Sequence, residues 1–285
     1  MVCIGGHYLI KIGKSTLLGL IASILFVIGA IVATGMPSAF WNLPSALIII
    51  GGTLGAVIIA FPPNRLRTLG PVILHTLIKQ KTDIKDDVLS LVALSEISRK
   101  EGLLSMEEHI DEYTDDEFIK EGLLLIIDGC DEEQLRETLE GSTYFMKLRH
   151  QKGAAMLDMI AATAPALGLL GTYVGLIPML HHIEDPSKLG PMMALELISS
   201  FYGGFIAYVI FSPLAKRLKF MSGEEAVRRE IIIEGIAAIQ QGKNPALIRK
   251  ELLAFINVKT TETKSKFKPF EPIEVEKKVK DKKVS

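Results

Sequence analysis

The strongest constraint on the fold of this 285-residue chain is a set of four apolar blocks, over residues 16–34, 43–61, 159–180 and 191–214. Each block is long enough to cross the hydrocarbon core of a membrane as a helix, which takes about 20 residues. Glu196 is the one charged residue within the four blocks. We therefore predict an all-α integral membrane protein with four transmembrane helices and a large helical cytoplasmic domain.

A cleaved signal peptide is the alternative interpretation of the first block, because Lys11 and Lys14 precede it and the small residues Ala33 and Gly35 end it. The apolar region of a signal peptide is shorter, at about 7–15 residues. We favour a transmembrane helix, preceded by a cytoplasmic N-terminal leader over residues 1–15.

The distribution of Lys and Arg predicts the orientation of the four helices. The segment 62–153 carries twelve of these residues, whereas the loops 35–42 and 181–190 carry only Lys188. Basic residues also precede the first block and directly follow the fourth. Because cytoplasmic loops are enriched in Lys and Arg, we expect the long loop and both termini on the cytoplasmic side of a bacterial inner membrane.

These patterns divide the chain into six parts. Only eight residues separate the first two blocks, so we expect residues 16–61 to form a tight helical hairpin. Residues 62–153 and 215–256 have the charged, amphipathic pattern of cytoplasmic helices. Between them, residues 154–214 hold the third and fourth transmembrane helices. The Lys-rich tail 257–285 has few apolar residues, which predicts disorder.

The third and fourth blocks each carry a narrow stripe of small and polar residues at helical spacing. The stripes comprise Ala161, Pro165, Gly168, Thr172 and Gly175, and then Glu196, Ser200, Gly203 and Ala207. Such stripes let helices approach closely, and we favour helix packing as the role of the glycines. Thr172 and Ser200 lie at similar depth, where two hydroxyls could replace water around a small cation.

Three further residues of these blocks are candidates for function. A carboxylate inside a transmembrane helix is costly, so Glu196 is a functional candidate, although a position near the interface is an open alternative. Pro165 and Pro213 each remove a backbone donor and permit a helix to bend. Kinks of this kind are also ordinary in membrane helices.

A cluster of charges flanks Gly102 in the long loop, with Arg99 and Lys100 before it and Glu107 and Glu108 after it. One interpretation is a solvated helical hairpin with intramolecular ion pairs. The other is a surface that selects a partner, because exposed charges contribute little to stability.

Other classes of function lack support. A net charge of −1, from 32 basic and 33 acidic residues, gives no attraction to nucleic acid. Cys3 and Cys130 are far apart and lack zinc-ligand spacing, and His181 and His182 are adjacent, so we predict no metal site. No residues suggest hydrolytic or acid–base chemistry, so we predict that the chain is not an enzyme and has no cofactor.

Seven segments of the chain are distinctive when taken together in this order: RKEGLLSME (99–107), GLLLIIDG (122–129), APALGLLGTYVG (164–175), DPSKLGP (185–191), SSFYG (199–203), SPLA (212–215) and EGIAAIQQG (234–242). They resemble segments of the MotA and PomA stator subunits of the flagellar motor, within the MotA/TolQ/ExbB superfamily. The resemblance spans residues 17–256.

The resemblance implies an ion-driven torque generator. MotA-like subunits form a pentamer around a dimer of a MotB-like or PomB-like partner, which has a single span with an essential aspartate and is anchored to peptidoglycan. Arg99 and Glu107 match the charges that engage the rotor protein FliG, with Lys100 and Glu108 beside them. Residues 62–153 would then be the rotor-contact domain, and Pro165 and Pro213 match prolines linked to conformational switching.

The resemblance also bears on the transported ion. Thr172, Ser199 and Ser200 fall where sodium-driven members have three threonines, which favours sodium slightly over protons and leaves both open. Ala162 stands where members usually have an acidic residue, so Asp158 or Glu196 would have to supply the missing charge.

Two other functions are weighed against this one. Energisers of the ExbB or TolQ kind use related machinery to drive envelope transport, but they have three spans, whereas this chain has four predicted spans. A passive membrane scaffold would use the small-residue stripes only for packing and would show no ion dependence.

Overall fold

The computed structural model describes residues 14–77 and 84–255, and every regular element in these ranges is helical. The first two membrane blocks form α1 (Lys14–Ala33), η1 (Pro37–Phe40), α2 (Leu43–Ala46), η2 (Leu47–Gly51) and α3 (Gly52–Ala60). The linker and cytoplasmic elements are α4 (Pro63–Leu66), α5 (Leu69–Leu77), α6 (Ile84–Glu101), η3 (Leu104–His109), α7 (Ile110–Tyr113) and α8 (Glu117–Ile127). The remaining elements are α9 (Glu132–His181), α10 (Pro186–Gly204), η4 (Phe205–Phe211), α11 (Ser212–Gln240) and α12 (Pro245–Phe255).

Four helical segments are long and apolar enough to cross a membrane, and they coincide with the four predicted blocks. They lie within Thr16–Ala33, Pro37–Ala60, Glu132–His181 and Pro186–Gln240. The predicted all-α membrane fold is therefore confirmed. Most of the predicted leader (1–15) and the predicted disordered tail (257–285) fall outside the described residues.

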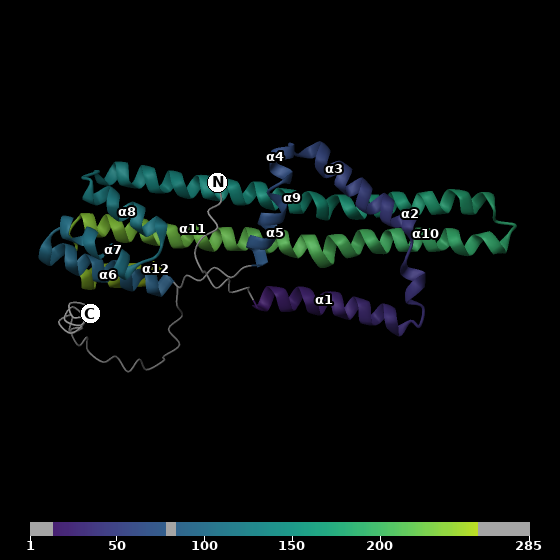
Figure 1. Cartoon of the computed structure of the whole chain (residues 1–285), viewed down its shortest axis with the longest axis horizontal. Coiled ribbons are helices and arrows are strands. Elements are labelled where there is room, and N and C mark those ends of the chain that lie inside the picture. The colour runs from purple at the N-terminus through teal and green to yellow at the C-terminus, as the bar shows by residue number, and fades with distance from the viewer. Residues whose placement is uncertain (1–13, 78–83, 256–285) are drawn as a thin grey trace, which may run out of the picture.

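Two long helical rods dominate the molecule (Figure 1). One is α9, with 50 residues, which at 1.5 Å per residue is about 75 Å long. The other runs without a break through α10, η4 and α11, from Pro186 to Gln240. They lie antiparallel and side by side along most of their length. The third and fourth spans therefore continue directly into the cytoplasmic helices.

The first two spans do not pack against each other as the expected hairpin. Helix α1 contacts η4, whereas α3 packs against α9, and Figure 1 shows α1 and α3 on opposite sides of the α9–α10 pair. The connecting loop explains this separation, because it is tied to α10. Tyr202 Oη donates to Phe40 O, and Asn42 N donates to Tyr202 Oη at 3.3 Å.

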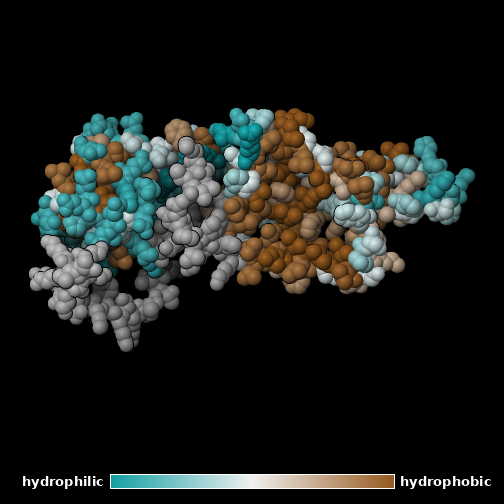
Figure 2. Space-filling model, in the orientation of Figure 1, coloured by the Kyte–Doolittle hydropathy of each residue, from teal (hydrophilic) through white to brown (hydrophobic). Residues whose placement is uncertain are grey.

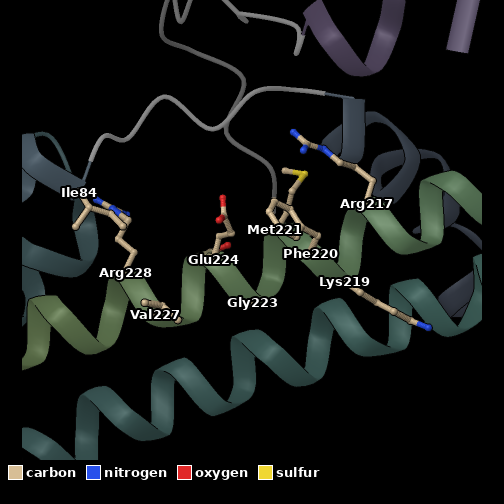
Figure 3. A pocket seen from close by; sticks show the side chains of 10 residues that line it. Ile84, Arg217, Lys219, Phe220, Met221, Gly223, Glu224, Val227 and Arg228 are labelled. Carbon is tan, nitrogen blue, oxygen red and sulfur yellow. The ribbon is translucent and has the colours of Figure 1, made fainter. Parts of the chain in front are cut away.

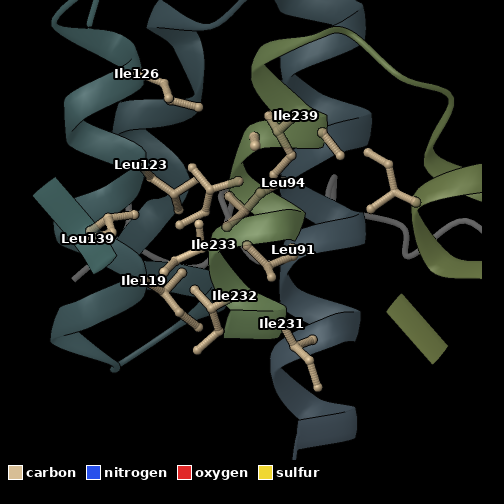
Figure 4. Close-up of a cluster of buried hydrophobic side chains, with 14 of the residues drawn as sticks. Leu91, Leu94, Ile119, Leu123, Ile126, Leu139, Ile231, Ile232, Ile233 and Ile239 are labelled. Atoms are coloured by element: carbon tan, nitrogen blue, oxygen red, sulfur yellow. The ribbon is translucent and has the colours of Figure 1, made fainter. Parts of the chain in front are cut away.

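The polar end of the molecule is a compact helical domain with its own core (Figure 4). Helices α6, α8 and α12 surround the N-terminal end of α9 and the C-terminal half of α11. Its largest fully buried side chains are Leu91, Leu94, Met106, Ile119, Leu123, Leu135, Leu139, Ile232 and Ile236. Figure 2 shows the contrast between this polar end and the apolar spans. The core fixes the cytoplasmic surface to the two rods.

An ion triad joins three helices of this domain. The guanidinium of Arg228 on α11 contacts Asp87 on α6 through Nε and Nη2, at 2.6 and 2.9 Å. Its Nη2 also contacts Asp116 at 2.7 Å. Asp116 is the N-cap of α8, where Oδ1 accepts from the backbone N–H groups of Phe118 and Ile119. The triad therefore sets the position of α8 relative to α6 and α11.

Candidate functional site

The third and fourth spans meet at a seam of glycines. A Cβ atom at Gly203 would lie 2.6 Å from the carbonyl oxygen of Ala164, and one at Gly168 would lie 3.1 Å from that of Ser199. At Gly175 the nearest atom would be the carbonyl oxygen of Met192, at 2.8 Å. These distances leave room for hydrogen only, so the helices touch backbone to backbone. The packing interpretation of the glycines is confirmed.

Ser199 lies inside this seam rather than on an open surface. Its side chain is fully buried and faces Gly171, where an added Cβ would come within 2.5 Å. Its hydroxyl donates to Ser45 Oγ at 3.0 Å, and Ser45 belongs to the second span. The sequence groups Ser199 with Thr172 and Ser200 as candidate ion-path hydroxyls. In the structure of the single chain, Ser199 is buried in the seam, whereas the other two are at least partly exposed. Its part in ion transport stays a prediction.

Thr172 and Ser200 follow directly on the pair Gly171 and Ser199, so they lie at nearly the same height along the two helices. Ser200 is exposed and Thr172 is partly exposed. The Thr172 hydroxyl donates to the carbonyl oxygen of Leu169 at 2.7 Å, which leaves its lone pairs free. Two oxygens at one level can therefore accept a cation or a water molecule.

Glu196 lies one turn from Ser200 towards the outer end of α10. Its Cβ would be 3.2 Å from a Cβ placed on Gly175, so a glycine on α9 makes room for this side chain. The side chain is partly buried. Its carboxylate forms no hydrogen bond or ion pair with any residue that the structure describes. An unpaired carboxylate beside the seam is available to a cation or to a partner chain.

The resemblance implies an acidic residue at the position of Ala162, and Asp158 and Glu196 are the two candidates for supplying that charge. Asp158 forms an ion pair with Lys219, with 2.6 Å between Oδ2 and Nζ, and both side chains are about half exposed. This pair joins the two rods on the cytoplasmic side of Ala162. Because the charge of Asp158 is already paired with Lys219, Glu196 is the better candidate for a carboxylate that interacts with the ion.

The two prolines occur in different settings. Pro165 lies within α9, which continues past it to His181, and its Cα would be 3.2 Å from a Cβ on Gly203. Pro213 lies in the first turn of α11, directly after the π-helix η4. In η4 the Ser212 N–H donates to the carbonyl oxygen of Ala207, five residues earlier. A wider turn next to a proline is a place where a helix can bend.

The four cytoplasmic charges are all exposed. Arg99 and Lys100 lie in the last turn of α6, the chain turns at Gly102 with φ of +94°, and Glu107 and Glu108 follow in η3. Within the described ranges none of the four forms a hydrogen bond or ion pair. The intramolecular ion pairs of the first interpretation are therefore not formed. The arrangement presents unpaired charge of both signs, which suits contact with a partner.

Sequence reasoning missed the polar network that holds the second span to the fourth. The Ser45 hydroxyl is 3.0 Å from Asn42 Oδ1, 3.3 Å from the carbonyl oxygen of Leu195 and 3.0 Å from Ser199 Oγ. A signal was present, because Asn42 precedes the apolar block and Ser45 lies in its first turn. These are typical residues of a helix start, and Asn42 Oδ1 indeed accepts from the Ser45 N–H at 3.0 Å.

Comparison with known proteins reveals similarity over most of the chain. Residues 111–231 match the MotA/TolQ/ExbB proton channel family. The chain is 38% identical over 237 residues to the uncharacterized protein YtxD of Bacillus subtilis, covering 82% of this chain and 87% of that one. It is 37% identical over 227 residues to motility protein A of Treponema phagedenis, covering 79% and 86%. The flagellar MotAB stator complex from Bacillus subtilis superposes with a TM-score of 0.77 at 32% identity, covering 85% and 96%.

Proposed function

This chain belongs to the motility protein A family of flagellar stator subunits, and we propose that it couples the influx of sodium ions or protons to torque on the rotor. The observation that carries this proposal is the pair of unbroken rods. They join a seam with hydroxyls at one depth of the membrane to a cytoplasmic domain with unpaired charges. Movement at one end of such rods is transmitted to the other.

The ion path of the proposal needs a partner. The described part of this chain places hydroxyls, but no aspartate, between Gly168 and Gly175, so an aspartate in this path would have to come from a partner. We propose that a dimer of a MotB-like subunit, with a single span and a peptidoglycan anchor, supplies it. The similar Bacillus subtilis complex pairs MotA with MotB, which supports this partner. Five copies of this chain would surround the dimer in the bacterial inner membrane, with both termini in the cytoplasm.

In this mechanism Thr172 and Ser200 replace part of the hydration shell of the ion. Ser199 supports them from within the seam through its bond to Ser45. Binding of the ion beside these hydroxyls can do mechanical work only if the bound ion favours one of two arrangements of the ring. Pro165 and Pro213 are the positions where the rods could bend between these arrangements, and Arg99, Lys100, Glu107 and Glu108 would then push on FliG.

Deletion of the gene tests the proposed function. We expect cells that lack the chain to carry flagella that do not rotate, and we expect expression of the chain to restore rotation. Flagella would be counted by microscopy and rotation recorded on tethered cells. Normal rotation in a strain without any other stator gene would contradict the proposal. An envelope-transport defect in its place would favour an energiser of the TolQ or ExbB kind.

We expect Glu196→Gln to reduce the rotation rate several-fold and to change its dependence on sodium concentration. The substitution keeps the shape of the side chain but removes the unpaired charge beside Gly175. Rotation of tethered cells would be recorded across sodium concentrations at constant ionic strength. Glu184→Gln, in the exposed loop before α10, is the matched control and should have no effect. Unaltered speed in Glu196→Gln would exclude this residue from the ion path.

We expect Arg99→Glu to weaken torque at low stator expression and a reversed charge on FliG to restore part of it. Arg99 is exposed and unpaired within the described residues, so its substitution leaves the core of the domain intact. Torque would be measured from the rotation of beads on flagellar stubs. Lys250→Glu changes the charge equally at another exposed position and serves as the control. Wild-type torque in Arg99→Glu would argue against rotor contact through this residue.

A further inference from the structure

A cavity of about 690 Å³ lies along α11 just beyond the cytoplasmic end of the fourth span (Figure 3). Its lining includes Arg217, Phe220, Met221, Glu224 and Val227 from α11, with Ile84 from α6. The apolar block ends at residue 214, so the cavity begins at the depth where lipid headgroups meet the cytoplasm.

Arg217 is the available cation at the membrane end of the cavity. Its Nε is buried and has no hydrogen-bond partner in the structure as described, and a buried N–H normally has one. The other two basic lining residues are already engaged. Lys219 points away towards α9, where it pairs with Asp158, and Arg228 is held by the ion triad. Arg217 therefore lacks an acceptor among the residues that the structure describes, and a ligand could supply one.

Glu224 gives the far end of the cavity the opposite charge. It lies seven residues after Arg217, which is two helical turns or about 10.5 Å along the same face. It is exposed and unpaired in the described part of the chain, whereas its neighbour Glu225 pairs with Arg229. Figure 3 shows Arg217, Met221 and Glu224 on the side of α11 that faces away from α9. From the membrane towards the cytoplasm, the cavity therefore presents first the cation of Arg217, then an apolar surface, and then the carboxylate of Glu224.

We propose that this cavity binds the headgroup of phosphatidylethanolamine from the cytoplasmic leaflet. The phosphate of this lipid lies nearest the membrane and its primary ammonium lies further out, which is the order that Arg217 and Glu224 match. The guanidinium of Arg217 donates to phosphate oxygens, and the ammonium donates to the Glu224 carboxylate. Phe220, which is 58% exposed, and Met221 provide apolar contact for the glycerol and the start of the acyl chains.

The two charges also explain why other lipids fit less well. Phosphatidylglycerol carries no cation, so its headgroup offers hydroxyl donors to Glu224 but no counter-charge. The quaternary ammonium of phosphatidylcholine has no N–H group to donate. The inference depends on the membrane position of the fourth span and not on torque generation, so it can fail while the proposed stator function holds.

The test is native mass spectrometry of the full chain, purified with its partner subunit, after mild removal of lipid and addition of one lipid at a time. We expect the wild type to retain phosphatidylethanolamine at least several-fold more than phosphatidylcholine or phosphatidylglycerol. Arg217→Gln should abolish this retention. Glu224→Gln should weaken the preference for phosphatidylethanolamine over phosphatidylcholine while keeping some binding of both, because a neutral amide oxygen accepts from the ammonium less strongly than a carboxylate does.

Lys216→Gln is the matched control, because it removes an exposed basic charge next to Arg217 and should leave retention unchanged. Melting temperatures of all variants would show that each is folded. Equal retention of phosphatidylethanolamine by the wild type and both cavity variants would overturn the proposal. It would also be overturned if phosphatidylglycerol were retained best, or if soluble phosphoethanolamine bound as well as the lipid.

Discussion

Gly203→Ala is expected to abolish rotation and to lower the melting temperature of the purified complex. The added methyl group would lie 2.6 Å from the carbonyl oxygen of Ala164 and 3.2 Å from the Cα atoms of Gly168 and Pro165. All three are backbone atoms of α9, so no side chain can turn away to make room. The third and fourth spans would have to separate by several tenths of an ångström. Overpacking of this kind typically costs about 1–3 kcal/mol, and here it also displaces the predicted ion path.

Gly204→Ala is the control for this substitution. It makes the same chemical change one residue later, where the nearest atom to the new methyl group would be a side-chain carbon of Tyr208 at 3.9 Å. We expect Gly204→Ala to leave rotation and melting temperature close to those of the wild type. Rotation would be recorded on tethered cells and melting followed by circular dichroism. Normal rotation in Gly203→Ala would mean that the third and fourth spans do not approach each other this closely at Gly203.

The number and position of the spans were predictable from the sequence, because a membrane demands long apolar helices and tolerates few charges within them. The sequence did not allow us to predict where the helices end beyond the membrane. The predicted borders after residues 153 and 214 mark a change of environment, and the sequence shows it as a change from apolar to charged residues. Helices α9 and α11 continue across these borders. Composition therefore located the membrane but not the ends of the helices.

The residues of the candidate site could be proposed from the sequence, but which of them are exposed and which are buried could not be predicted. Ser199 and Ser200 are neighbours in sequence, yet one is buried against Gly171 and the other is exposed. Consecutive helical residues point about 100° apart, so the packing of α10 on α9 decides which hydroxyl faces outward. Likewise, Asp87 and Arg228 are 141 positions apart, and no local pattern connects them. Both features depend on tertiary contacts.

Arg228→Ala is expected to destabilise the cytoplasmic domain by about 3–5 kcal/mol, because it leaves the carboxylate of Asp87 buried without a counter-ion. Asp87 is only 5% exposed. Burial disfavours the charge on Arg228, but the hydrogen bonds to Asp87 and Asp116 outweigh burial and raise the pKa of Arg228 above its ordinary value. Arg228 therefore keeps its positive charge at every pH where the protein is handled. Hydrogen exchange of the amides in α6, α8 and α11 would measure the loss.

Two further variants test whether the cost arises from the unpaired charge or from the loss of a favourable pair. Lys250→Ala removes an exposed, unpaired cation and should leave amide exchange unchanged. Arg228→Met combined with Asp87→Leu replaces both buried charges with apolar side chains, and it should recover most of the lost stability. Asp116 stays as the N-cap of α8 in this double variant and remains partly exposed. If the double variant were as unstable as Arg228→Ala, the triad would stabilise the domain by its own attraction. The contact between α6, α8 and α11 would then depend on charge rather than on the apolar core beside it.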